Sequence, residues 1–194
     1  MLDPNLEGQL LIAMPGMPDS RFARSVVYMC SHSQEGAMGL IINKLADDLR
    51  FGDLLKQVKL FDDDETIEFN GDDADRPVHT GGPVETSRGF VLHSPDYQTP
   101  SATITITDGI CLTATTGILK AIATGNGPEY AMLALGYSGW GPGQLESELG
   151  ANGWLNCPAD PDLVFAEDPS IKYDRALSVL GVDPSHLVST AGRA

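Results

Sequence analysis

The chain has 194 residues, of which 42% are hydrophobic and 20% are charged, and its 12 Lys and Arg against 27 Asp and Glu give a formal charge of -15 at pH 7. This ordinary composition predicts one globular domain spanning residues 1–194 and excludes a disordered chain. The acidic balance disfavours direct DNA binding, because affinity for nucleic acid depends on Lys and Arg that neutralise phosphates.

The chain shows neither a membrane-segment pattern nor a signal-peptide pattern. No apolar run approaches the roughly 18 residues that a membrane helix requires, and the start of the chain carries Asp3 and Glu7 without a nearby Lys or Arg. Cys30, Cys111 and Cys157 are widely separated and form no CxxC motif, which favours buried free thiols in a reducing compartment. We therefore expect a cytoplasmic protein that does not enter the membrane.

The beginning of the chain predicts three strands. The short apolar segment Gln9–Ala13 ends at a loop rich in proline and glycine, and β-branched and aromatic residues return at Ser25–Cys30. The most apolar short run is Met38–Asn43, which follows a polar turn. It predicts a central strand that forms a hairpin with Ser25–Cys30.

An acidic region follows these strands. Phe51–Val58 places apolar residues at helical spacing, which predicts a two-turn helix, and the rest of Leu45–Arg76 is expected to be solvated loop. Its acids do not predict a calcium site, because loops that begin at Asp62 or Asn70 lack the glycine that an EF-hand requires. No other metal or cofactor motif occurs, so we expect neither.

Gly81-Gly82-Pro83 predicts a tight turn, since glycine permits close backbone approaches and proline then fixes φ. Strands are expected on both sides of this turn, at Pro77–Thr80 and Arg88–His93. The segment Ala102–Thr107 alternates strictly, so its isoleucines are expected to face the core and its threonines to face outward.

The remaining segments mix helices and short strands. Helical spacing at Thr113–Ala123 and at Leu145 and Leu149, after Pro142, predicts two further helices. Another helix is expected to begin at Ser170 as its N-cap and to end at Gly181. The strand candidates in this part of the chain are Tyr130–Leu135, Trp154–Asn156 and Leu163–Phe165.

Together these elements predict an α+β domain with a mostly antiparallel, strongly bent sheet and about four short helices. The connections between Ser25 and Thr107 are of hairpin length, whereas a regular parallel sheet needs a crossover helix between strands.

Several short segments also match the patterns of one known family, in the family's order. They are Met14–Gly16, Arg24–Tyr28, Gly36–Lys44, Gly81–Val84, Arg88–His93, Gly136–Gly141 and Gln144–Glu146. Through them the chain resembles the bacterial YqgE/AlgH family over nearly its full length. The resemblance implies a bent, partly barrel-like sheet with helices packed around it, and it implies no reaction. The label "transcriptional regulator", sometimes attached to the family, comes without a recognisable DNA-binding motif.

The chain departs from the family pattern at three places. Ser20 and Leu45 stand where the family often has proline, and Arg193 stands where it commonly has histidine. A role of that histidine is therefore not carried over to this chain.

The sequence favours a non-enzymatic binding or regulatory protein with a small polar pocket. The alternative is a hydrolase-like enzyme with a Ser or Cys nucleophile and a histidine, because triad partners need not be close in sequence. Motifs such as GxSxG and SxxK are missing, and so are HExxH and the P-loop, which removes specific support for a hydrolase, a metal site or nucleotide binding.

The candidate binding residues lie in loops beside the predicted strands, where polar groups can converge on one face. Arginine in such a pocket suits a carboxylate or phosphate, so we expect a small anion or a protein partner, such as a carboxylate-bearing peptide, as the ligand. The Gly81–Pro83 and Gly139–Gly143 loops are expected to lie together in space. The candidates are Arg24, Ser25, Asn43, Gly81, Gly82, Arg88, His93, Trp140, Gln144 and Glu146.

Overall fold

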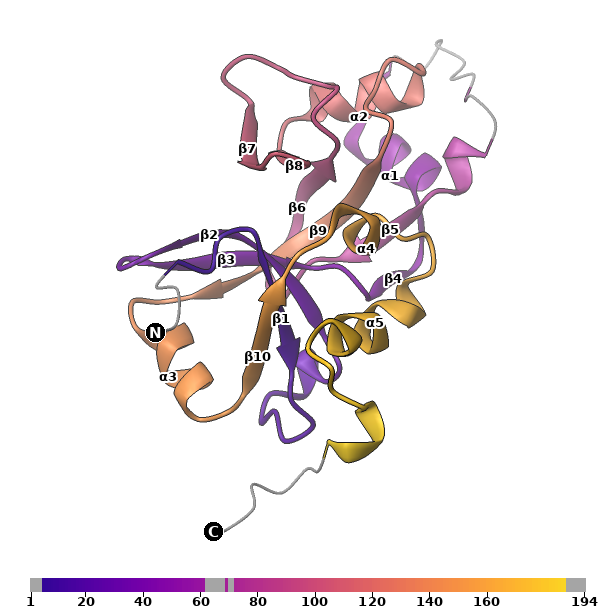
Figure 1. Cartoon of the computed structure of the whole chain (residues 1–194). Coiled ribbons are helices and arrows are strands. Elements are labelled where there is room, and N and C mark those ends of the chain that lie inside the picture. Colours follow the sequence, from indigo (N-terminus) through magenta and orange to yellow (C-terminus); the bar gives the residue numbers. More distant parts are fainter. Residues whose placement is uncertain (1–4, 62–68, 70–71, 188–194) are drawn as a thin grey trace, which may run out of the picture.

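Within residues 5–61, 69 and 72–187, which the computed structural model describes, ten strands form one curled sheet (Figure 1). The strands are β1 (Gln9–Ala13), β2 (Val26–Ser33), β3 (Gly36–Ile41), β4 (Leu45–Arg50), β5 (Pro77–Thr80), β6 (Val84–His93), β7 (Thr103–Thr107), β8 (Ile110–Thr113), β9 (Ala131–Trp140) and β10 (Trp154–Pro158). The α-helices are α1 (Phe51–Val58), α2 (Thr116–Ala123), α3 (Gln144–Gly150), α4 (Pro161–Val164) and α5 (Lys172–Val179).

The sheet runs in the order β10-β1-β2-β3-β9-β6-β8-β7, with antiparallel neighbours throughout. Strand β5 lies off this path, parallel to β9 and antiparallel to β4. The predicted α+β fold with a bent, mostly antiparallel sheet is confirmed. The described residues contain five α-helices where about four were expected.

Strand β9 joins the two halves of the sheet. Its first half pairs with β5 and β6, through contacts such as Leu133 with Val78 and Val91, whereas its second half pairs with β3, through Ser138 with Gly39. Gly136, at φ 72°, lies where β9 changes partner. Strand β9 is therefore the central strand of the fold, because it pairs with β3, β5 and β6.

The Gly81–Gly82 turn crosses β9 at that point. A Cβ on Gly81 would lie 2.3 Å from the carbonyl oxygen of Gly136, and one on Gly82 would lie 2.2 Å from Tyr137. The Gly81 amide donates to Leu135 at 2.8 Å, and its carbonyl accepts from Ile41 at 2.8 Å. Glycine is required at both positions because the two backbones are in contact there and leave no room for a side chain.

The helices cover three apolar clusters. Helices α1 and α2 lie side by side over β5, β6 and β9, where residues such as Phe51 and Ile118 are buried. Helices α4 and α5 cover the interior of the curled sheet, and α3 packs near β10, where Trp140 and Trp154 form a third cluster. No helix in the described part of the chain is long and apolar enough to span a membrane.

Some expected elements were wrong. Leu163–Phe165 is not a strand, because the Asp160 side chain accepts from the Asp162 amide and Pro161 begins helix α4. Leu45–Arg50 is strand β4 and not loop, because β5 provides a partner.

Two further details differ from the expectation. Ser170 is not the cap of α5: Asp168 caps a short 3-10 turn at Pro169–Ile171, and α5 then runs from Lys172 to Val179 without a side-chain cap. Ile104 is 61% exposed, and only Ile106 of the two β7 isoleucines packs against the core. The acidic run 62–65, the loop start Asn70 and the terminal Arg193 lie outside the described residues.

Candidate functional site

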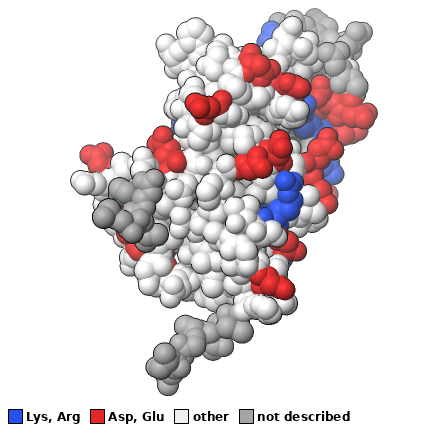
Figure 2. Space-filling model, in the orientation of Figure 1, with Lys and Arg blue, Asp and Glu red and all other residues white. Residues whose placement is uncertain are grey.

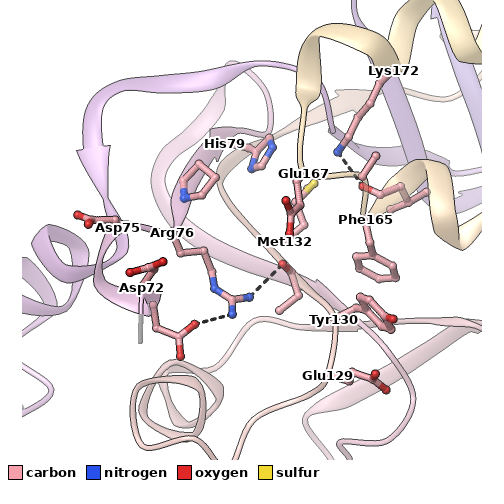
Figure 3. Close-up of a pocket in the computed structure, with 15 residues that line it drawn as sticks. Asp72, Asp75, Arg76, His79, Glu129, Tyr130, Met132, Phe165, Glu167 and Lys172 are labelled. Atoms are coloured by element: carbon pink, nitrogen blue, oxygen red, sulfur yellow. Dashed lines mark hydrogen bonds and ion pairs between the residues drawn. The ribbon is translucent and has the colours of Figure 1, made fainter. Parts of the chain in front are cut away.

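A cleft of about 500 Å³, which we call the Lys172 cleft, opens where three distant segments meet (Figure 3). Its walls are β5 with the turn before it, the start of β9, and the connection from α4 to α5. A concave site lined by polar and aromatic groups with altered pKa values is where a ligand is expected first. The side chains that line this cleft include Arg76, His79, Glu129, Tyr130, Phe165, Glu167 and Lys172.

Lys172 begins α5 and is only 1% exposed, although it lines the cleft. Its Nζ donates to the carbonyl oxygens of Ile42, at 2.9 Å, and Val164, at 2.7 Å. An ammonium group has three N–H donors, so one remains. Among the described residues no carboxylate forms an ion pair with it, and burial lowers the pKa of Lys172 to about 8. Two carbonyl dipoles therefore face this charge, and no carboxylate of the described residues does.

His79 lies on β5 and is 5% exposed. Its Nδ1 is 3.2 Å from the carbonyl oxygen of Leu133. Since a carbonyl oxygen only accepts, Nδ1 carries the proton, and Nε2 keeps a lone pair in the neutral ring. Burial, with the nearby Lys172 charge, lowers the pKa of His79 to about 4, so the ring is neutral at pH 7. It offers a ligand an acceptor and no charge.

Arg76 connects the turn before β5 to the start of β9. Its guanidinium donates to the Asp73 carboxylate at 2.7 Å and to the carbonyl oxygen of Ala131 at 3.4 Å, as Figure 3 shows. The side chain keeps 28% of its surface exposed. It is held in place and still reaches the cleft.

The rest of the cleft is acidic and aromatic. Five carboxylates line it against two cations, and the wider surface in Figure 2 likewise shows more acidic than basic side chains. The rings of Tyr130 and Phe165 stack with centroids 6.0 Å apart. Arg76 and Lys172 are therefore the two positive charges among the described residues of an otherwise acidic cleft.

This arrangement suits binding by ion pair and hydrogen bond. The described residues that line the cleft include no Ser, Thr or Cys, so they supply no such nucleophile. Within residues 5–61, 69 and 72–187, no group of three or more His, Cys, Asp or Glu is arranged to hold a metal.

The candidates near the N-terminus, Arg24, Ser25 and Asn43, hold one corner of the fold. Asn43 accepts from the Val26 amide at 2.8 Å and donates to the carbonyl oxygen of Arg24 at 2.8 Å. Arg24 pairs with Asp174 at 3.3 Å, and Ser25 is fully buried. Through its hydrogen bonds to Val26 and Arg24, Asn43 fixes the chain after β3 to the start of β2.

Trp140 and Gln144 belong to a second corner, held by the Glu148 carboxylate. Its Oε2 accepts from the indole N–H groups of Trp140, at 2.9 Å, and Trp154, at 2.8 Å, and its Oε1 accepts from Gln144 at 2.9 Å. The Gln144 Oε1 in turn accepts from the amide of Gly141 at 3.0 Å. The glycine-rich loop is thus fixed onto α3.

Glu146 lies on α3 as well, and it pairs with His32 on β2. The ring Nε2 is 2.8 Å from Glu146 Oε1, while Nδ1 accepts from the Leu6 amide at 3.1 Å. Because Nδ1 is an acceptor, Nε2 carries the proton and donates to the carboxylate. This contact links the chain before β1 to α3.

His93 and Arg88 occupy separate places on β6. His93 is fully buried, with Nε2 2.9 Å from Thr113 Oγ1 and Nδ1 2.9 Å from the carbonyl oxygen of Ser94. Arg88 pairs with Glu85 at 3.4 Å and lines a groove of about 750 Å³.

The Gly81–Pro83 turn does lie beside the second glycine-rich segment, since Ser138 Oγ donates to the carbonyl oxygen of Gly81 at 3.2 Å. Gly139 and Trp140 were expected in a loop, but they form the end of β9. The shared pocket with Arg24, Asn43 and His93 was wrong, however. His93 is sealed inside the core, and Arg24 and Arg88 pair with different acids, Asp174 and Glu85.

The cysteine thiols of the hydrolase alternative form no hydrogen bond to a histidine in the described part of the chain. The three cysteines are buried and free, and their hydrogen bonds among the described residues go to Tyr28, Thr105, Gln98 and Ala176 rather than to histidine. Burial raises the pKa of Cys30, and raises that of Cys157 to about 11, which disfavours the reactive thiolate.

Sequence reasoning did not single out Lys172, Arg76 or His79. A lysine at the start of an amphipathic helix is ordinarily solvated. No local signal showed that α4 would cover it, because α4 itself was predicted as a strand. The carbonyl groups that hold Lys172 belong to distant segments.

Comparisons with known proteins agree with the fold. A family model described as AlgH-like matches residues 10–185. A UPF0301 protein from a Methylobacterium species is 60% identical over 97% of this chain and 90% of its own length, and one from Afipia carboxidovorans is 58% identical with the same coverage.

Two solved structures are also similar. The solution structure of the AlgH protein from Pseudomonas aeruginosa has a TM-score of 0.79 and 40% identity, covering 100% of this chain and 98% of that one. A crystal structure from Corynebacterium diphtheriae has a TM-score of 0.67 at 18% identity, covering 96% and 97%, and shows the fold alone. These names state a family and no activity.

Proposed function

This chain belongs to the AlgH-like family of bacterial proteins, and we propose that it is a binding protein for a small carboxylate, which it holds in the Lys172 cleft. One observation carries the proposal. The ammonium group of Lys172 is buried beside an open cleft, has a free donor, and has no carboxylate partner among the described residues. A buried cation without a counter-ion is costly unless a ligand supplies one.

The charges around the cleft favour a carboxylate over a phosphate. Five acidic residues surround Arg76 and Lys172, and they repel a dianion more strongly than a monoanion. A single carboxylate can take the free donor of Lys172 and approach the guanidinium of Arg76. The neutral His79 ring supports a hydrogen bond without adding charge.

A regulatory role would depend on binding of the small ligand and not on direct binding to DNA. The formal charge of -15 opposes a phosphate backbone. The free thiols of all three cysteines support a cytoplasmic location. Binding to random duplex DNA at physiological salt with micromolar affinity would contradict this part of the proposal.

Titration calorimetry with sodium caproate at about pH 7 tests the proposed site. We expect binding to the wild-type protein and at least a tenfold weaker affinity for Lys172→Met, since a charge-assisted hydrogen bond contributes roughly 1.5–3 kcal/mol. Lys56→Met is the matched control, because Lys56 lies on α1 and its side chain is 80% exposed.

Caproamide, which has the same chain without the charge, should not bind measurably to the wild-type protein. Equal affinities of the wild type and Lys172→Met for caproate would overturn the proposal. A circular dichroism spectrum of each variant shows whether it is folded.

A further inference from the structure

A second cleft of about 580 Å³ adjoins the Lys172 cleft, and we call it the Asp162 cleft. The two clefts share Glu129, Tyr130 and Phe165 in their walls. Because the same side chains line both, a ligand that lies across them can occupy both hollows at once. The Asp162 cleft is otherwise formed by the chain after β6, the β7–β8 turn and the start of α4.

The shared wall contains an aromatic pair, in which Tyr130 is exposed and Phe165 is half-buried. Tyr130 and Phe165 stack with an interplanar angle of 27°, and Tyr130 remains 53% exposed. An exposed aromatic face between two hollows offers apolar contact to a methylene chain. It also attracts a cation placed over it, by the interaction of positive charge with the ring face.

The Asp162 cleft favours a positively charged group, whereas the ammonium of Lys172 favours a negatively charged one. Its lining includes Asp96, Asp162 and Glu129, and no Lys or Arg is among the described residues that form it. The Asp96 carboxylate accepts from the Glu129 amide at 2.9 Å, which fixes its position. A hydrogen bond from Ser94 lowers the pKa of Asp96, so this carboxylate stays ionised at pH 7.

Building on the proposed function, we propose that the two clefts form one extended site for a ligand with a carboxylate at one end and an ammonium or guanidinium group at the other. The carboxylate pairs with Lys172, the apolar middle crosses Tyr130 and Phe165, and the cation meets Asp162 and Asp96. Three observations support the same ligand class: a buried ammonium without a carboxylate partner in the described part of the chain, an aromatic pair beside it, and the acidic Asp162 cleft beyond that pair.

Calorimetry with ε-aminocaproate and caproate separates this inference from the proposed function, since the two probes differ only in the terminal ammonium. We expect ε-aminocaproate to bind the wild-type protein at least tenfold more tightly than caproate. Asp162→Asn should reduce that preference at least fivefold while leaving the affinity for caproate unchanged. Asp174→Asn is the matched control, because Asp174 is a surface acid on α5 that pairs with Arg24 outside both clefts.

Each outcome decides the inference. Equal affinities for the two probes, or an Asp162→Asn variant with the wild-type preference, would overturn the extended site while leaving caproate binding at Lys172 intact. Failure of both probes to bind the wild-type protein would overturn the proposed function and the extended site together. Tyr130→Ala provides a second variant, and it should weaken ε-aminocaproate more than it weakens caproate.

Discussion

The ammonium nitrogen of Lys172 lies 2.9 Å from the carbonyl oxygen of Ile42, a residue 130 positions earlier in the chain. This hydrogen bond connects the start of α5 to the chain just after β3. A second hydrogen bond, to the carbonyl oxygen of Val164 at 2.7 Å, holds the same ammonium group against the end of α4. The same contacts stabilise the C-terminal helices and build the candidate site, so the two roles have to be separated by experiment.

The pH dependence of stability reports the burial of Lys172. Its pKa in the folded protein, about 8, is below the ordinary value of 10.5, so the unfolded chain holds more protons between these pH values. Stability conferred by this group therefore rises with pH across that window. Relative to Lys172→Met, the wild type should gain roughly 2 kcal/mol in unfolding free energy between about pH 7 and about pH 9.5. Urea denaturation at both pH values measures this, and a constant difference would contradict it.

His79 should make the protein sensitive to acid. Its folded pKa of about 4 is below the ordinary value of 6.5, so protons bind preferentially to the unfolded chain between these values. The wild type is expected to lose stability as the pH falls from 6.5 toward 4, and His79→Gln should lose less. His186→Gln is the control, since His186 is exposed. Parallel stability curves for the wild type and His79→Gln would show that burial of this ring does not have the expected effect.

The Gly81 crossing predicts a strong effect from one methyl group. Gly81→Ala places a Cβ 2.3 Å from the carbonyl oxygen of Gly136, so two strands must separate. We expect a loss of about 3 kcal/mol or more in unfolding free energy. Gly117→Ala, on α2, meets no atom within 4 Å and should be neutral or stabilising by roughly 0.5–1 kcal/mol. Similar stabilities of the two variants in urea would be inconsistent with the close crossing.

Glu148 should matter more to stability than Glu146 on the same helix. Glu148→Gln replaces a carboxylate that accepts two indole N–H groups, from Trp140 and Trp154, and we expect a cost of roughly 1–3 kcal/mol. Glu146→Gln, at a carboxylate whose side chain is 54% exposed, should cost less than about 1 kcal/mol. Thermal unfolding followed by circular dichroism compares them, and the reverse order would refute the assignment.

Local patterns were sufficient to predict most of the fold. The alternation at Ala102–Thr107 and the isoleucine-rich run at Met38–Asn43 identified strands, because strand formation there depends on nearby residues. The same reasoning misassigned Leu163–Phe165, since three apolar residues suit either a strand or a helix. The deciding factor was the Asp160 cap, a contact of one side chain.

The candidate site was less predictable because its parts are far apart. Gly81 and Gly82 were correctly singled out as unusual, but their unusual feature is a close backbone crossing with Gly136. Lys172 gave no signal, since its burial depends on carbonyl groups of Ile42 and Val164 that only the folded chain brings together. Contacts between residues so far apart in the chain produce no recognisable motif or residue spacing in the sequence.

NMR titration of the Lys172 side chain, with and without saturating caproate, shows whether the ligand pairs with the buried ammonium group. A carboxylate that pairs with the ammonium stabilises its charged form. We expect caproate to raise the pKa of Lys172 from about 8 by about one unit or more, which corresponds to a tenfold difference in caproate affinity between the charged and neutral forms. An unchanged pKa in the presence of bound caproate would contradict it.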